Sequence, residues 1–190
     1  MYARTLSEEI KKRLGSGKAI VVVGSRQVGK TTLLEAILST KEYLLLDGDD
    51  PTTRTLLTNP NTEQIRIIIG KYKVVFIDEA QRIEGIGLTM KIITDRFKEV
   101  QLFASGSSAF DLSNKINEPL TGRKWEYQLF PISWEEFEAH HGYLHAEQQL
   151  ENRLLYGFYP DVLNNPGDEI ARLKNLVNSY LYKDILSYTD

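Results

Sequence analysis

The sequence predicts an α/β fold in which helices cover both faces of a mostly parallel β-sheet. Apolar segments of strand length alternate with helical segments through residue 133 of the 190 residues. Most of these strands are continuous apolar runs, which is typical of parallel strands that are buried on both faces. After residue 133 only helical segments follow, so we expect a helical subdomain behind the sheet.

Turn residues separate the predicted elements along the chain. The predicted strands cover residues 19–24, 43–47, 73–80, 101–108 and 124–131. The predicted helices cover residues 7–14, with Ser7 as N-cap, then 30–40, one or two helices between 52 and 70, 88–97 and 109–116. A boundary near residues 140–146 divides a core, 1–142, from a helical subdomain, 143–190, whose last helix has no closing element, as if cut from a longer chain.

Composition restricts the class of protein. Hydrophobic residues make up 42% and charged residues 26%, which is the ordinary globular range. A net charge of −3 excludes a global basic field that would draw the chain to nucleic acid, and the absence of cysteine excludes disulfides and thiolate chemistry. The apolar runs are too short to span a bilayer, and the N-terminus lacks the apolar core of a signal peptide. We therefore expect a cytoplasmic protein without a membrane partner.

The stretch VVVGSRQVGKTT, residues 21–32, predicts a phosphate-binding loop between a buried strand and a helix. It contains the pattern G-x-x-x-x-G-K-T, which directs several backbone N–H groups and a helix N-terminus toward one anion. Lys30 can reach the β- and γ-phosphates of ATP, and the Thr31 hydroxyl can bind Mg²⁺. The predicted cofactor-binding residues are Gly24, Ser25, Arg26, Gln27, Val28, Gly29, Lys30, Thr31 and Thr32.

Two carboxylates end the apolar strand VVFIDEA. Asp78 is suited to hold Mg²⁺ through water, so Thr31 and Asp78 are the predicted metal residues. Glu79 can orient and deprotonate an attacking water, a step that a hydrolase needs and a kinase does not. The pair therefore favours ATP hydrolysis over phosphorylation of a small molecule.

Two further segments contain catalytic candidates. In FASGSS, Ser107 is the first choice and Ser105 the second for a side chain that senses the γ-phosphate, and a simple turn explains the segment equally well. Arg123 lies directly before the fifth strand and can serve as an arginine finger, in the same chain or in a neighbour. A surface arginine is the alternative.

In this order, the motifs resemble those of an AAA+ ATPase. More narrowly, RQVGKTTLL, IDEAQ, GSS, LTGR, PISWEEF and YGFYPDV resemble a bacterial and archaeal AAA+ family, with matches from residue 4 to about residue 185. The resemblance implies a P-loop NTPase core with strand order 5-1-4-3-2, a helical lid, ATP binding and hydrolysis. Family members usually continue into a C-terminal domain of undefined function, with a nuclease-related role among the alternatives, so the resemblance implies that this domain is missing here.

Other polar and aromatic groups have simpler explanations. Asp47, Asp49 and Asp50 follow the second strand and fit a solvated turn better than a metal site. His140, His141 and His145 do not have the spacing of a structural zinc site. The aromatic residues of YGFYPDV could stack on bases, but no basic stripe accompanies them, so nucleic acid is not an indicated partner.

Three functions remain open at this point. The leading one is an ATP-hydrolysing, Mg²⁺-dependent AAA+ module with ATP and ADP as its ligands. The second is a slow nucleotide-dependent switch of a signalling or defence type. The third is a nucleic-acid-stimulated motor, although 190 residues do not supply the second sheet domain of a helicase. The sequence also leaves open whether the chain forms a homo-oligomer.

Overall fold

The computed structural model describes residues 1–106, 112 and 116–186, and for residues 179–186 only the backbone. The chain forms two compact units. We call Thr5–Ser25 with Lys30–Leu129 the sheet unit, and Met1–Arg4 with Arg26–Gly29 and Phe130–Asp190 the helical unit. The predicted helix 109–116 falls largely outside the described residues.

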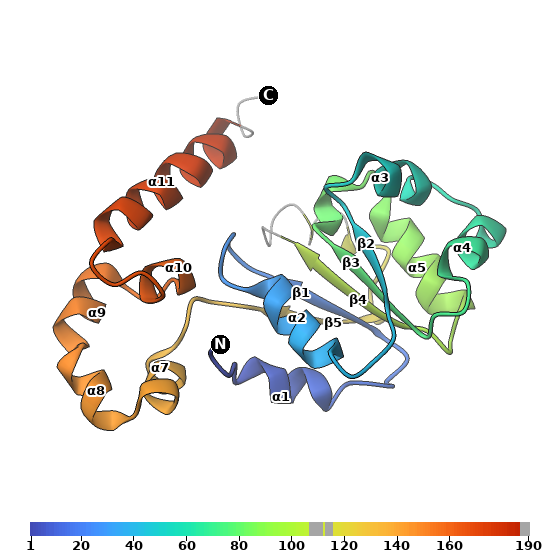
Figure 1. Ribbon diagram of the computed structural model, residues 1–190. Helices are drawn as coiled ribbons and strands as arrows, with labels where there is room; N and C mark the ends of the chain where they lie inside the picture. Colours follow the sequence, from blue (N-terminus) through green and yellow to red (C-terminus); the bar gives the residue numbers. More distant parts are fainter. Residues whose placement is uncertain (107–111, 113–115, 187–190) are drawn as a thin grey trace. The chain divides into compact units, whose positions relative to one another are not determined.

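Five parallel strands form the centre of the sheet unit (Figure 1). Their order is β2-β3-β4-β1-β5, which is the predicted order 5-1-4-3-2 read from the other edge, and all pairings are parallel. The fold class predicted from the sequence is therefore confirmed. The strands are β1 (Ala19–Val23), β2 (Leu44–Asp47), β3 (Val74–Asp78), β4 (Gln101–Gly106) and β5 (Lys124–Gln128).

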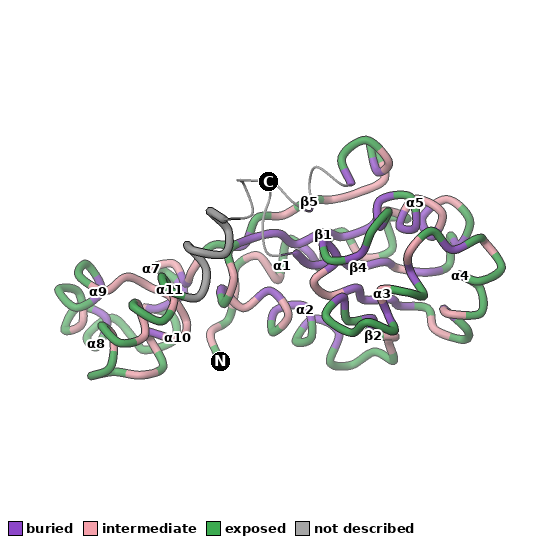
Figure 2. Tube along the Cα trace, turned by 90° about the horizontal axis from the view of Figure 1, so that it is seen from above, coloured by how far each residue is buried: buried purple, intermediate pink, exposed green. Residues whose placement is uncertain are grey.

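Burial follows the position of each strand in the sheet. β1 is buried along its whole length, because it lies inside the sheet between β4 and β5 and is covered on both faces (Figure 2). The edge strands β2 and β5 are only partly buried. This difference explains why the central strands are continuous apolar runs, whereas β5 mixes charged and aromatic residues.

Helices cover the sheet on two faces. Side chains of α3, α4 and α5 form one apolar core with alternate residues of the strands, such as Val21 and Ile77. The apolar residues of α2 are buried outside that core, so α2 covers the opposite face together with α1 (Figure 1). These helices are α1 (Leu6–Lys11), α2 (Lys30–Leu38), α3 (Pro51–Leu57), α4 (Thr62–Ile69), the short helix η1 (Ala80–Arg82) and α5 (Ile86–Arg96).

Local capping determines where several helices begin. The Asp50 carboxylate accepts the Thr52 N–H before α3, and this backbone hydrogen bond lowers the pKa of Asp50. Asn61 and Gln64 form a capping box at α4. Ser7, by contrast, lies within α1 and is not its N-cap, since the helix begins at Leu6.

The helical unit contains five helices among its described residues. These are α7 (Trp134–His141), α8 (Tyr143–Gln148), α9 (Leu150–Tyr156), α10 (Pro160–Leu163) and α11 (Glu169–Leu186). A small core of Ile132, Phe137 and Ala146 holds it together, with Tyr2 and Phe158 packed against that core. The expected boundary after residue 142 falls inside this unit, between α7 and α8, whereas the two units divide after Leu129.

Candidate functional site

The phosphate loop connects the end of β1 to the start of α2. Gln27 and Gly29 have left-handed backbone conformations, with φ of 61° and 93°, and a non-glycine residue in this region is strained. α2 begins at Lys30, so the N–H groups of its first turn have no intrahelical acceptor. The predicted residues Gly24 to Thr32 thus form a turn and a helix N-terminus of the kind that binds anions.

Lys30 is held against the loop from which it projects. Its side chain is buried, and Nζ donates to the carbonyl oxygens of Gly24 and Ser25, each at 2.9 Å. These hydrogen bonds satisfy the ammonium in an environment where an unpaired charge would be unfavourable. They also keep the cation beside the backbone that a phosphate would approach.

Gly24 is required by the close approach of Leu129, the residue that follows β5. A Cβ atom at this position would lie 2.3 Å from the Leu129 carbonyl oxygen, well inside van der Waals contact. The Leu129 N–H donates to the Val23 carbonyl at 2.8 Å, which holds the two backbones together. The first glycine of the motif therefore has a packing reason in addition to its place in the loop.

Asp78 at the end of β3 receives hydroxyl donors from two neighbouring elements. Thr31 Oγ1 donates to Asp78 Oδ2 at 2.8 Å, and Ser105 Oγ donates to Oδ1. Ser105 is fully buried on β4, which lies between β1 and β3 in the sheet. The strand order therefore brings the phosphate loop, Ser105 and Asp78 together, as expected for the carboxyl ends of parallel strands.

Of the two serines proposed from the sequence, Ser105 is thus placed at the site by its contact with Asp78. Ser107, the first choice, lies outside the described residues. The Ser105 contact could not be predicted from the sequence, because it depends on the pairing of β4 with its neighbours.

Glu79 has an unusual backbone conformation for its residue type. Its φ is 46°, in the left-handed region, and it precedes η1. Its Oε2 accepts a hydrogen bond from Gln81 Nε2 at 2.5 Å. Strained residues of this kind concentrate at functional sites, because surrounding structure must hold them. The sequence motifs assign no role to Gln81, although its position two residues after Glu79 is a local signal.

Gly48 is a second position to which the sequence motifs assign no role. Its N–H donates to the Asp78 carbonyl at 2.9 Å, and a Cβ atom there would lie 2.4 Å from the Glu79 carbonyl oxygen. Only a residue without a side chain therefore allows β2 to end so close to the acidic pair. In the sequence this glycine had the appearance of an ordinary turn residue.

The oxygen atoms at Thr31 and Asp78 fit a magnesium ion. Mg²⁺ prefers oxygen ligands and usually retains several waters, so a protein supplies only one or two groups together with substrate phosphates. Within the described residues no group of three or more His, Cys, Asp or Glu side chains could hold a metal ion. Thr31 and Asp78 therefore offer two oxygen donors, the number that a Mg²⁺ site completed by substrate phosphates and water takes from the protein.

Arg123 lies at the amino-terminal end of the parallel strands, whereas the phosphate loop lies at their carboxyl-terminal end. Its carbonyl accepts the Ala19 N–H at the start of β1, whereas the loop follows the end of β1. Its Nε donates to Asp95 Oδ1 at 2.7 Å, and this hydrogen bond lowers the pKa of Asp95. A five-residue strand spans about 15 Å, so Arg123 does not reach the loop of its own chain.

The remaining acidic and histidine candidates have structural partners. Asp47 accepts the Asp49 N–H, and Asp49 forms an ion pair with Arg82, while Asp50 caps α3. The turn interpretation of these residues is thus supported. In the helical unit the His141 ring meets the His140 ring edge to face and stacks on the His145 ring, with centroids 4.8 Å and 5.0 Å apart. Phe158 packs edge to face on Trp134 and Phe137.

A family model described as an AAA domain matches residues 16–138 of this sequence, which is more than half of the chain. The chain belongs to the AAA domain family. As a P-loop AAA domain it is a nucleotide-binding module, and the family predicted from the sequence motifs is confirmed.

The relatives of this AAA domain include two uncharacterized proteins of Mycobacterium tuberculosis and Mycobacterium bovis, each 27% identical over 121 residues. The alignments cover 63% of this chain and 26% of each relative. An uncharacterized protein of Methanocaldococcus jannaschii is 22% identical and matches 97% of this chain and 45% of its own length. This chain therefore spans less than half the length of these relatives.

Among solved structures, the Walker-type ATPase PABY2304 of Pyrococcus abyssi superposes with a TM-score of 0.66 at 15% identity. The alignment covers 99% of this chain and 75% of that chain, so the two share a fold.

In the part of the chain that the structure describes, none of the helices has the length and apolar character needed to cross a bilayer.

Proposed function

We propose that this AAA domain binds ATP with Mg²⁺ and hydrolyses it. The observation that carries the proposal is the meeting of the Thr31 and Ser105 hydroxyls on the Asp78 carboxylate, with Glu79 as the next residue. If Asp78 only capped the following loop, it would not need the buried Ser105 of β4 as a hydrogen-bond donor. In this proposal, phosphate binding, metal binding and activation of water take place together at the carboxyl ends of the strands.

Each residue has a defined task in this proposal. The loop from Gly24 to Thr32 binds the phosphates, and Lys30 exchanges its carbonyl partners for phosphate oxygens. Thr31 and Asp78 would hold the metal ion, Asp78 through water. When bound, Mg²⁺ supplies positive charge that neutralises the charge developing on the transferred phosphoryl group.

Glu79 is the proposed base, which accepts the proton of the attacking water. Its hydrogen bond from Gln81 keeps the carboxylate in a defined orientation.

Ser105 orients Asp78, and Ser107 remains the candidate for sensing the γ-phosphate. Arg123 is the proposed finger for the site of a neighbouring subunit, which would make the assembly a homo-oligomer.

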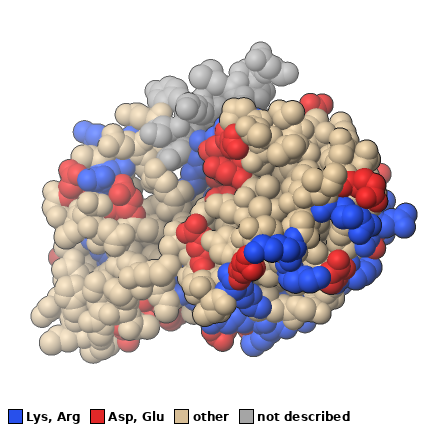
Figure 3. Space-filling model, turned by 45° about the vertical axis from the view of Figure 1, so that its right-hand side comes forward, with Lys and Arg blue, Asp and Glu red and all other residues tan. Residues whose placement is uncertain are grey.

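The wider context of the domain belongs to the same proposal. A C-terminal domain in the parent chain fits the greater length of the curated relatives. Acidic and basic side chains lie beside one another on the face seen in Figure 3, and the net charge is −3, so the proposal includes no nucleic-acid partner. A cytoplasmic location fits a site that consumes ATP.

The replacement of Glu79 by Gln tests the hydrolysis step. The amide retains the shape of the side chain but cannot accept a proton. We expect ATP binding close to wild type by calorimetry and a turnover reduced by about 10²–10⁴-fold, the usual contribution of a general base. The matched control is Lys30→Ala, which should abolish both binding and turnover.

The outcomes separate the alternatives. Normal turnover in Glu79→Gln would exclude Glu79 as the base. ATP binding without turnover in the wild type, at every protein concentration tested, would instead favour the nucleotide-dependent switch. Stimulation of turnover by DNA or RNA would favour the motor.

A further inference from the structure

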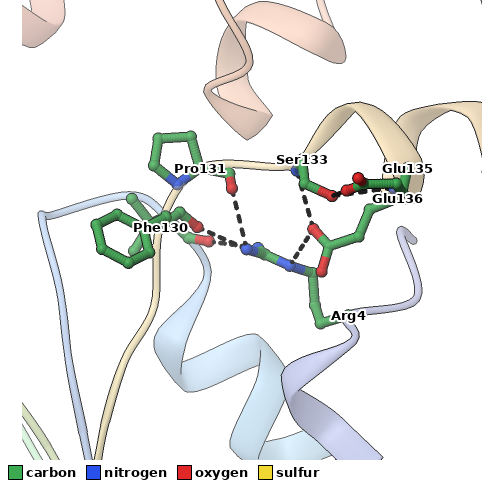
Figure 4. A network of polar contacts seen from close by, with 7 residues as sticks. Arg4, Phe130, Pro131, Ser133, Glu135 and Glu136 are labelled. Carbon is green, nitrogen blue, oxygen red and sulfur yellow. Dashed lines mark hydrogen bonds and ion pairs between the residues drawn. The ribbon is translucent and has the colours of Figure 1, made fainter.

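Arg4 joins three segments of the helical unit that are far apart in the sequence (Figure 4). Nη1 donates to the carbonyl oxygen of Val28 in the phosphate loop at 3.0 Å. Nη2 donates to the carbonyls of Phe130 at 2.5 Å and Pro131 at 3.3 Å, and Nε lies 3.0 Å from Glu136 Oε2. One guanidinium thus contacts the loop, the segment after β5 and the first turn of α7.

This ion pair is nearly inaccessible to solvent. The exposed fraction of the side chain is 9% for Arg4 and 4% for Glu136. Removing two charges from water is unfavourable unless the geometry is good and further hydrogen bonds satisfy the remaining polar groups. The planar guanidinium can satisfy several acceptors at once, which a lysine ammonium on a flexible stem does less well.

Glu136 is itself held in a fixed position. Its Oε2 accepts the Ser133 N–H at 3.1 Å, and Ser133 Oγ accepts the Glu136 N–H at 3.1 Å, which is a capping box at the start of α7. The acceptor for Arg4 is therefore fixed by a helix terminus rather than by a free surface side chain. The position of the guanidinium is determined in turn.

The Val28 carbonyl that Arg4 binds lies in the same peptide unit as the Gly29 N–H. No cis peptide bond is present in the described residues, and in a trans peptide the C=O and N–H point in opposite directions. A carbonyl held toward Arg4 therefore directs the Gly29 N–H away from Arg4. Gln27 and Gly29, on either side of Val28, have left-handed φ values, so this orientation needs external support.

We propose that Arg4 is a positioning residue of the nucleotide site, which sets the Val28–Gly29 peptide so that the Gly29 N–H is available to a phosphate. The Arg4–Glu136 pair links this peptide to the start of α7. Nucleotide binding and the docking of the N-terminal segment are then coupled, and the coupling is reciprocal. The inference rests on the proposed function, because it assumes that the loop binds the phosphates of ATP.

The experiment compares Arg4→Met, Arg4→Lys and Glu136→Gln with a matched control, Arg153→Met. Arg153 is a buried arginine of the same unit, 3.7 Å from Glu169, and its described contacts do not include the phosphate loop. We expect Arg4→Met to weaken Mg·ATP binding by about tenfold, measured by calorimetry on the full chain. Arg153→Met should lower the melting temperature but leave the ATP affinity of the folded protein unchanged.

Two further readouts separate positioning from general stability. Arg4→Met should raise KM more than it lowers kcat, because the loop binds ground state and transition state alike. In hydrogen-exchange mass spectrometry, ATP should protect the peptide that contains residue 4 in the wild type and in Arg153→Met, but not in Glu136→Gln. Arg4→Lys, which retains the charge, should bind ATP with intermediate affinity and replaces Arg4→Met if that variant does not fold.

Failure of the inference can be distinguished from failure of the proposed function. A wild type that does not bind ATP overturns both. A wild type that binds ATP, together with Arg4→Met and Arg4→Lys variants of the same affinity, overturns the positioning role alone. Equal losses of affinity in the Arg4 and Arg153 variants would reduce the network to general stabilisation of the unit.

Discussion

At the scale of single residues, the site depends on side chains whose partners are far away in the sequence. Asp78 is bound by hydroxyls from two other elements, and Lys30 is held by the carbonyls of its own loop. Glu79 and Gln27 have positive φ values. Conformations of this kind persist only where surrounding contacts impose them, so these residues are sensitive to substitutions at their partners.

His141 provides a prediction about pH. Partial desolvation, then the charges of His140, His145 and Arg153, lower its pKa below 6.5, and the Tyr2 hydroxyl is 2.9 Å from its Nε2. Because the unfolded chain then binds a proton more readily, the free energy of unfolding should rise with pH from the lowered pKa up to about 6.5. The effect should be small, since the side chain is exposed.

NMR titration of the histidine ring checks this prediction directly. The pKa of His141 should lie below 6.5 in the folded chain and return toward 6.5 in denaturant. Tyr2→Phe removes the hydrogen-bonding partner and serves as the comparison. A pKa of His141 at or above 6.5 would contradict the assignment.

At the scale of elements, strand order determines which loops meet. β4 lies between β1 and β3, so its end reaches both the phosphate loop and the acidic pair. β2 ends beside β3, where Gly48 allows the two backbones to approach. The acidic pair is therefore supported from both sides of its strand.

Gly48→Ala tests this support. A Cβ atom would lie 2.4 Å from the Glu79 carbonyl, so β2 or the Glu79 backbone must shift, at a cost of about 1–3 kcal/mol. At about 2–4 °C per kcal/mol the melting temperature should fall measurably, and turnover should fall further than the ATP affinity. Gly142→Ala is the control, because alanine at its φ of 83° would be strained but the added Cβ would have nothing within 4 Å. Unchanged turnover in folded Gly48→Ala would show that the acidic pair does not depend on this approach.

At the scale of the whole molecule, the position of Arg123 bears on assembly. It lies at the end of the strands opposite its own phosphate loop and pairs with Asp95. An arginine finger at this position must therefore act on another subunit. This requirement makes oligomerisation testable through activity.

We expect Arg123→Ala to bind ATP nearly as well as the wild type and to hydrolyse it about a thousandfold more slowly. This is the size of the rate contribution that an arginine finger makes in other ATPases and GTPases. Mixing it with Lys30→Ala should restore part of the turnover, because mixed neighbours rebuild an intact site. Asp95→Asn is the control, since it breaks the ion pair but retains the arginine. The absence of rescue, with turnover independent of protein concentration, would argue that Arg123 is structural.

Local sequence patterns specify the features that are encoded in consecutive residues. The buried strands, the phosphate loop from Gly24 to Thr32 and the pair Asp78–Glu79 are local patterns, because their chemistry and their periodicity lie within a few residues. The strand order followed from the resemblance of these motifs to a family, and the structure confirmed it.

The distant residues that support that site are brought to it by tertiary packing. Ser105 on Asp78, Arg4 on the Val28 carbonyl and Gly48 against the Glu79 backbone join segments between 24 and 31 residues apart. None of these contacts has a local signal, because each depends on strand pairing or on the packing of a separate segment. Strand direction also explains the position of Arg123. In a parallel sheet, residues that precede a strand and residues that follow one lie at opposite ends, so Arg123 lies far from the phosphate loop.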